Sequence, residues 1–173
     1  MDIVRIKFFN NFNKEDKKKC EIGGNIGIPF SSLVEKISPD GIIVLELSSF
    51  QLERIEEFKP HVAVVLNLTP DHLDRYPDLR SYMEAKLRIF ENQTDVDFAV
   101  LNADDKNSME LSLYSASRKI FFSTQKELEL GAVVKNGALF YKMNGKEEKV
   151  IETKDIAIKG PHNLSNASAA CAI

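Results

Sequence analysis

The 173-residue sequence lacks the features that mark several classes of protein. No apolar run approaches the ~20 residues that a helix needs to cross a bilayer, so we expect no membrane association. The two cysteines, Cys20 and Cys171, lie far apart and form no Cys-x-x-Cys pair, which predicts a reduced protein without a disulfide. The formal net charge is only -3. Such a chain has no basic field, so nucleic acid is not the expected partner.

The N-terminal residues also lack the pattern of a signal peptide. Residues 1–19, MDIVRIKFFNNFNKEDKKK, contain no uninterrupted apolar core followed by small residues. Residues 3–13 instead place apolar side chains at roughly helical spacing, which predicts an amphipathic helix. With 43% hydrophobic and 28% charged residues, the composition is that of one soluble domain, and we expect it in the cytoplasm.

The most informative stretch is residues 41–76, GIIVLELSSFQLERIEEFKPHVAVVLNLTPDHLDRY. Two short apolar runs, Ile42–Leu47 and Val62–Leu66, are rich in β-branched residues, as expected of neighbouring strands buried on both faces of a parallel sheet. Each run ends abruptly in polar residues. Because ligands of open α/β sheets bind beyond the carboxyl ends of the strands, we predict a site for a metal and an anionic ligand there.

Glu46 is the strongest candidate in the first run, since it interrupts an otherwise apolar strand at its carboxyl end. A buried carboxylate needs a cation or a hydrogen-bond donor as a partner. Ser48 and Gln51 follow with the spacing of a capping box. For these two residues, stabilisation of a helix start therefore competes with ligand binding as an interpretation.

The two histidines of the stretch are predicted to differ in role. His72 stands between Asp71 and Asp74 in the polar loop after the second run, where all three are potential metal ligands or bases. His61 comes just before that run. We expect it at the amino end of the strand, away from the predicted site.

The remaining segments alternate between helical and strand-like patterns. We predict an α/β fold with a mostly parallel sheet of the Rossmann or P-loop type, flanked by helices. Expected helices cover residues 29–37, 48–58, 79–92, 109–117 and 163–173, and further strands cover 20–22, 98–101 and 119–122. Two Asn-Gly pairs, at Asn136 and Asn144, predict a small three-stranded antiparallel meander over residues 132–151.

Lys86 lies in the helix expected over residues 79–92. Its position is off the predicted core stripe, so position alone predicts a solvated lysine. The stripe consists of Leu79, Met83, Leu87 and Phe90.

Six motifs, in this order and spacing, resemble the central, ATP-binding domain of the Mur ligases. They are GGNIGIPF, VLELSSFQLE, NLTPDHLDRY, AKLRIF, VLNADD and GPHNLSNASAA, and the resemblance covers about residues 20–173. GGNIG and ELSSFQLE are most similar to the members that add D-glutamate. The resemblance implies a cytoplasmic bacterial enzyme of peptidoglycan synthesis. ATP would phosphorylate the carboxylate of UDP-N-acetylmuramoyl-L-alanine, and the amine of D-glutamate would attack the acyl phosphate.

The resemblance also implies roles for particular residues. Glu46 and His72 would hold two Mg²⁺ ions, and Lys86 matches a lysine that CO₂ carbamylates. A carbamate would turn Lys86 from a cation into a carboxylate-like ligand, which reverses the interpretation from position alone. No redox cofactor is implied. The other implied contacts are Asn25, Ser48 and Gln51 with the UDP substrate, and Asn163 and Asn166 with the adenine and ribose of ATP.

One part of the family pattern is missing, because no GxxxxGK[ST] phosphate loop occurs in these residues. We therefore expect one truncated central domain over 1–173, with 1–19 as an atypical segment and 131–158 as an antiparallel subdomain. The chain alone is predicted not to turn over. The strand before that loop is central in the family, so its absence should expose two strand edges or an apolar groove. Either the N-terminal segment fills this gap, or chains associate through it.

Two other interpretations stay open at this point. The chain could be a fragment of a folylpolyglutamate-type or another Mur amide ligase. It could also be a non-catalytic module that binds a nucleotide.

Overall fold

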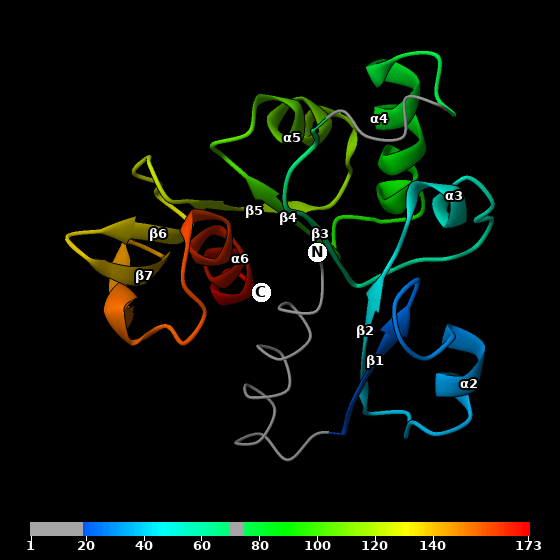
Figure 1. Ribbon diagram of the computed structural model, residues 1–173, viewed down its shortest axis with the longest axis horizontal. Coiled ribbons are helices and arrows are strands. Elements are labelled where there is room, and N and C mark those ends of the chain that lie inside the picture. The colour runs from blue at the N-terminus through cyan, green and yellow to red at the C-terminus, as the bar shows by residue number, and fades with distance from the viewer. Residues whose placement is uncertain (1–18, 70–74) are drawn as a thin grey trace. The chain divides into compact units, whose positions relative to one another are not determined.

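A computed structural model describes residues 19–69 and 75–173 of the chain (Figure 1). The chain divides into two compact units, one up to Leu52 and one from Glu53 to Ile173. The predicted helix over residues 3–13 lies outside the described residues, as do Asp71, His72 and Asp74.

The first unit contains a two-stranded parallel sheet of β1 (Cys20–Gly24) and β2 (Ile42–Glu46). Both strands confirm the predictions. The helix expected over residues 29–37 is shorter, since α2 covers only Phe30–Val34 and begins after Pro29. A second short helix, α3, covers Ser49–Leu52.

The two glycines that end β1 let the GGNIG loop fold back tightly. The Gly24 N–H donates to the Ile28 carbonyl at 2.9 Å, and the Asn25 N–H donates to the Glu46 carbonyl at 2.8 Å. Gly24 has φ +111°, and a Cβ at this position would run into the Glu46 carbonyl oxygen. Glycine is therefore required where the loop meets the end of β2.

The second unit is built on a six-stranded sheet in the order β3-β4-β5-β6-β7-β8. The pairs from β3 to β6 are parallel, and β6, β7 and β8 are antiparallel. The mostly parallel sheet and the antiparallel meander are thus confirmed, with β6 shared by both parts. The strands are β3 (Val62–Val65), β4 (Phe98–Asn102), β5 (Arg118–Ser123), β6 (Gly131–Lys135), β7 (Ala138–Met143) and β8 (Lys146–Glu152).

The two apolar runs of the central stretch belong to different sheets. Strand β2 pairs with β1, whereas β3 pairs with β4. The prediction that they are neighbouring strands is therefore wrong for the described residues. An apolar run predicts a buried strand, but backbone hydrogen bonds have no sequence signature that identifies the partner strand.

Helices cover both faces of the six-stranded sheet. In Figure 1, α4 (Leu79–Leu87) and α5 (Lys106–Leu111) lie on one side and α6 (Pro161–Cys171) on the other. The small side chains of α6 allow this helix to pack close to the strands. No helix in the described part of the chain is both long and apolar enough to span a membrane. One core cluster consists of Leu66, Val100, Phe122, Ala132, Leu139, Ala169 and Ala172.

The helix expected over residues 48–58 ends at Leu52. Two side chains donate hydrogen bonds to the backbone carbonyls that follow. Arg88 donates to the carbonyls of Glu53 and Ile55. Asn92 donates to those of Glu56 and Phe58. These long-range bonds replace the hydrogen bonds that would continue the helix. Local propensity alone cannot reveal such a competition.

Helices α4 and α5 also differ from the prediction. The first ends at Leu87, followed by a 3-10 turn, η1 (Arg88–Phe90). Of the predicted stripe only Phe90 is fully buried, while α4 itself buries Tyr82 and Ala85. The second begins at Lys106, three residues earlier than predicted, because Asp105 caps it. It ends in the turn η2 (Ser112–Tyr114), and a further turn, η3 (Thr153–Asp155), follows β8.

Candidate functional site

Glu46 has the environment of a cation ligand. It is the last residue of β2, and its Oε2 atom is buried without a hydrogen-bond partner among the described residues. A buried carboxylate oxygen without a donor is costly unless a cation binds it. The orphaned oxygen therefore fits a Mg²⁺ ligand. No group of three or more His, Cys, Asp or Glu side chains gathers within residues 19–69 and 75–173.

Ser48 and Gln51 form the capping box that their spacing predicts. The Ser48 N–H donates to Gln51 Oε1 at 2.9 Å, and the Gln51 N–H donates to Ser48 Oγ at 3.4 Å. These bonds satisfy two backbone donors at the start of α3. The structural interpretation is therefore confirmed, and contact with a substrate stays a prediction for both residues.

Lys86 is half-buried on α4 rather than fully solvated. Its Nζ atom lies 5.3 Å from the ring centroid of Tyr82, one helical turn earlier. An ammonium over an aromatic face is attracted by the ring quadrupole. Lys86 is therefore less exposed than position alone predicts.

The carboxyl ends of β3 and β4 are joined by polar side chains. Asn102 donates to the Leu66 carbonyl at 2.9 Å, and Asp105 accepts the Leu68 N–H at 2.7 Å. Asn107 donates to the Leu68 carbonyl at 2.8 Å. The VLNADD motif thus holds the backbone that leads into the His72 loop.

The amino end of α6 carries the two asparagines expected on the ATP side. Gly160, with φ +106°, precedes the helix, and Pro161 occupies its first position. Asn163 donates to the Lys159 carbonyl at 2.8 Å, while Asn166 is half-buried one turn later. The free N–H groups of a helix start favour an anion.

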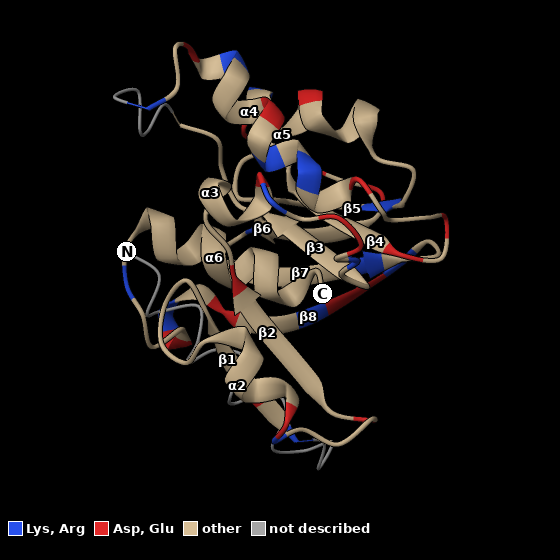
Figure 2. Ribbon diagram, turned by 90° about the vertical axis from the view of Figure 1, so that its right-hand side faces the viewer, with Lys and Arg blue, Asp and Glu red and all other residues tan. Residues whose placement is uncertain are grey.

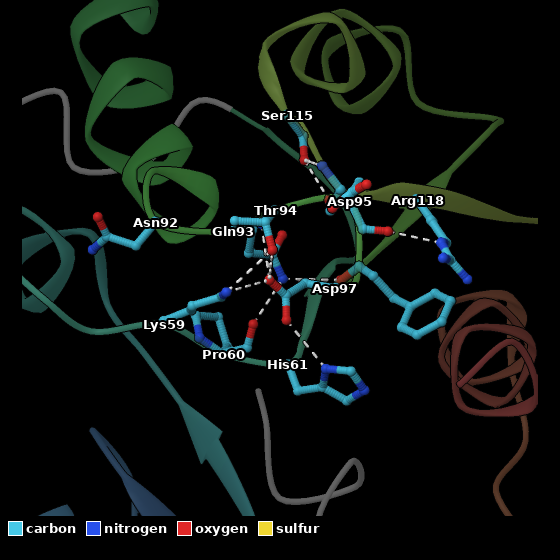
Figure 3. Close-up of polar contacts among 12 residues, drawn as sticks. Lys59, Pro60, His61, Asn92, Gln93, Thr94, Asp95, Asp97, Ser115 and Arg118 are labelled. Atoms are coloured by element: carbon cyan, nitrogen blue, oxygen red, sulfur yellow. Dashed lines mark hydrogen bonds and ion pairs between the residues drawn. The ribbon is translucent and has the colours of Figure 1, made fainter.

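A second group of polar side chains lies at the opposite end of the strands, the amino edge. We call it the Asp97 cluster, because its members surround Asp97 (Figure 3). Asp97 accepts hydrogen bonds from the Thr94 N–H at 2.8 Å and from the Thr94 hydroxyl at 3.1 Å. Lys59 Nζ lies 3.0 Å from Oδ2, and His61 Nδ1 lies 3.1 Å from Oδ1. His61 thus lies just before β3 and away from the carboxyl edge, as predicted.

The Asp97 carboxylate is held in its charged form. Its pKa is well below the ordinary value, chiefly because the Thr94 N–H donates to it, with Lys59 and His61 adding further hydrogen bonds. Only 4% of the side chain is exposed. The sequence contained no motif for this cluster, whose members come from separate segments.

Comparisons with known proteins show what this chain is similar to. A family model described as the Mur ligase middle domain matches residues 7–173. The UDP-N-acetylmuramoylalanine--D-glutamate ligases of Bacillus cereus (strain ATCC 14579) and Bacillus cytotoxicus are each 46% identical over 160 residues. That alignment covers 92% of this chain and 35% of each relative. The chain thus spans about a third of the length of these relatives.

Solved structures of other Mur ligases share the fold. A UDP-N-acetylmuramoyl-L-alanyl-D-glutamate--2,6-diaminopimelate ligase has a TM-score of 0.68 at 17% identity, covering 96% of this chain and 39% of that one. MurF from Acinetobacter baumannii has a TM-score of 0.60 at 14% identity, covering 90% of this chain and 42% of that one. With its family model matching nearly every residue, the chain belongs to the Mur ligase family and corresponds to its middle domain.

Proposed function

We propose that this chain is the middle-domain part of a ligase that joins D-glutamate to UDP-N-acetylmuramoyl-L-alanine at the expense of ATP. The observation that carries the proposal is the 46% identity over 160 residues to relatives named for this reaction. We further propose that the ligase acts in the bacterial cytoplasm through an acyl phosphate.

The proposed metal ligands are Glu46, His72 and a carbamylated Lys86. The orphaned Oε2 atom of Glu46 supports the first of these roles. Mg²⁺, when bound, would neutralise the phosphate charge that develops during transfer. Lys86 lies over the Tyr82 ring, so its side chain already has a defined position before any modification.

The proposed substrate contacts involve exposed or half-buried amides. Asn25 is exposed in the tight GGNIG loop, where it would meet the diphosphate of the UDP substrate. The capping box uses Gln51 Oε1, which leaves the amide N–H groups of this exposed side chain for the muramoyl portion, next to Ser48. Asn163 and Asn166 would contact the adenine and ribose of ATP.

Binding and turnover by the chain itself provide the first test. Since its sequence contains no phosphate loop, we expect no ATP-dependent amide formation in a coupled assay. Isothermal titration with ATP–Mg²⁺ and with UDP-N-acetylmuramoyl-L-alanine measures what binding is retained. Tight nucleotide binding without affinity for the UDP substrate would favour the non-catalytic nucleotide module instead.

A chimera tests the chemistry directly. The aligned 160 residues of the Bacillus cereus relative are replaced by those of this chain, and amide formation is measured with D-glutamate and with other amino acids. We expect activity with D-glutamate, and a loss of about 100-fold or more for Glu46→Gln, because the metal loses a charged ligand. Glu35→Gln, at an exposed glutamate of the first unit, is the matched control. Preference for another amino acid would overturn the proposal.

A further inference from the structure

Glu53 ends the ELSSFQLE motif, yet none of the roles above uses it. Its carboxylate accepts a hydrogen bond from the Tyr76 hydroxyl at Oε1 and from Arg75 at Oε2, the latter at 2.7 Å. These two donors, Tyr76 first, lower the pKa of Glu53. The residue is only half-buried, but its charged form has two fixed partners.

The backbone around Glu53 is held as well. The Arg88 guanidinium donates to the carbonyl of Glu53 and, at 2.6 Å, to that of Ile55. Arg88 follows Lys86 by two residues in the AKLRIF motif. Glu53 is therefore connected to both ends of the α4 segment, through Arg75 and Tyr76 before it and through Arg88 after it.

A line of packed rings leads from Glu53 to Lys86. The Tyr76 ring is 7% exposed and lies 5.4 Å from the Tyr82 ring, centroid to centroid, at an interplanar angle of 60°. Tyr82 is 5% exposed and carries the Lys86 Nζ atom 5.3 Å above its centroid. Both rings are buried and their edge-to-face contact is specific, so the position of Tyr76 constrains that of Tyr82.

We propose that Glu53 is a positioning residue that fixes the Lys86 side chain through Tyr76 and Tyr82. The Glu53 carboxylate accepts the Tyr76 hydroxyl, and the Tyr76 ring packs against the Tyr82 ring. The Tyr82 ring in turn contacts the amine of Lys86, one helical turn later. The importance of this arrangement for the reaction rests on the proposed function of Lys86. The arrangement itself is a property of the described residues and is testable without turnover.

The test uses the chain itself and the rate at which acetic anhydride labels Lys86, measured by mass spectrometry. Exposed Lys146 serves as the internal reference. We expect Glu53→Ala and Tyr82→Leu to speed Lys86 labelling about threefold, because the amine loses its contact with the ring. Tyr82→Phe, which keeps the ring, should label like the original chain.

Two further variants separate positioning from general loosening of the fold. Glu53→Gln still accepts the Tyr76 hydroxyl, so its labelling rate should return to that of the original chain. Glu57→Ala removes an exposed carboxylate from the same segment and should have no effect. Unchanged Lys86 labelling in Glu53→Ala would overturn the proposal. If Glu53→Ala does not fold, unchanged labelling in Tyr76→Phe would overturn it instead.

A second measurement distinguishes this proposal from the proposed function. Carbon-13 NMR of the chain in labelled bicarbonate reports a carbamate on Lys86, with Lys86→Arg as the blank. We expect the carbamate signal to fall in Glu53→Ala and to persist in Glu53→Gln. A shift in labelling with no carbamate in the original chain would retain the positioning role and overturn the proposed role of Lys86.

Discussion

At Asp97, two groups of Thr94 and the side chains of Lys59 and His61 converge on one buried carboxylate. These partners precede β3 and β4, so the charge of Asp97 joins the amino ends of two strands (Figure 3). The Asp97 N–H is also bonded to the Thr94 carbonyl, and its own carbonyl accepts the Arg118 N–H at the start of β5. A single side chain thus organises one edge of the sheet.

Replacing the carboxylate should reduce stability and change its dependence on pH. An aspartate whose pKa is lower in the folded state stabilises the fold above its unfolded pKa of about 3.9, and this contribution is lost as the pH falls toward the folded pKa. We expect Asp97→Asn to lower the melting temperature at pH 7 by about 5 °C. Below about pH 4, the difference from the original chain should shrink.

Melting curves from pH 7 to pH 2.5 measure this effect. Asp95→Asn is the control, because Asp95 is exposed and binds Arg118 through its backbone carbonyl rather than its side chain. A difference between the Asp97→Asn variant and the original chain that stays constant down to pH 2.5 would contradict the assigned role of the charge.

Among elements, the β5–β6 junction depends on a glycine. Gly131 begins β6 opposite Phe121 with φ +114°, and a Cβ there would collide with the Phe121 carbonyl oxygen. Gly145, in the turn between β7 and β8, also has positive φ, at +74°, but a Cβ would meet nothing within 4 Å. Both positions require a backbone with positive φ, but only at Gly131 would a Cβ atom also collide with a neighbouring strand.

Alanine at these glycines should separate the two effects. Gly131→Ala is expected to cost about 3 kcal/mol or more, because strand β6 must move away from β5. Gly145→Ala should cost about 1 kcal/mol from the left-handed backbone alone. Urea unfolding of both variants gives the comparison. Equal losses in the free energy of unfolding would show that the close approach of β6 to β5 adds nothing to the effect of Gly131→Ala.

The cap of α5 also joins two elements. Asp105 accepts the Leu68 N–H and the Ser108 hydroxyl, each at 2.7 Å, and the Asn107 N–H at 3.2 Å. We expect Asp105→Ala to cost about 2–4 kcal/mol, since the helix loses its cap and the Leu68 N–H loses its acceptor.

Urea unfolding measures that cost, with Glu110→Ala on the exposed face of α5 as the matched control. Hydrogen exchange at the Leu68 amide gives a second readout and should accelerate in Asp105→Ala. Unchanged exchange at Leu68 would refute the link between the cap and the loop.

For the whole molecule, the sheet edges differ in chemistry. Strand β8 ends the six-stranded sheet with charged residues of both signs, and β3 ends it with the apolar sequence VAVV (Figure 2). Charges discourage pairing at an edge, whereas an apolar edge invites it. Strand β2 also has an unpaired edge, because β1 is its one paired neighbour among the described residues.

We therefore predict concentration-dependent self-association, measured by sedimentation velocity. Ile42, at the start of β2, is 38% exposed, and Ile28, outside the named strands, is 41% exposed. Ile42→Lys should weaken association more than Ile28→Lys, because only the first places a charge on an edge strand. A monomer at all concentrations would argue against association through these edges.

The sequence by itself determined the class of fold, most strands and the antiparallel meander. Buried strands and Asn-Gly turns are local patterns, so β4 and the β6–β8 meander lie close to their predicted positions. Glu46 was also identifiable, since one acid in an apolar strand is a local anomaly. The six motifs pointed to the family for the same reason, that each is a short run of neighbouring residues.

Only the tertiary structure decided which segments meet. The early end of α3, the bond from the cap of α5 to Leu68 and the buried face of α4 involve Arg88, Asp105 and Tyr82. Their partners Glu53, Leu68 and Tyr76 lie in other segments of the chain. The contacts of Lys59 and His61 with Asp97, and the cluster around Glu53, were missed for the same reason. Side-chain hydrogen bonds over more than twenty residues leave no periodicity in a sequence, and they form only when the fold brings their members together.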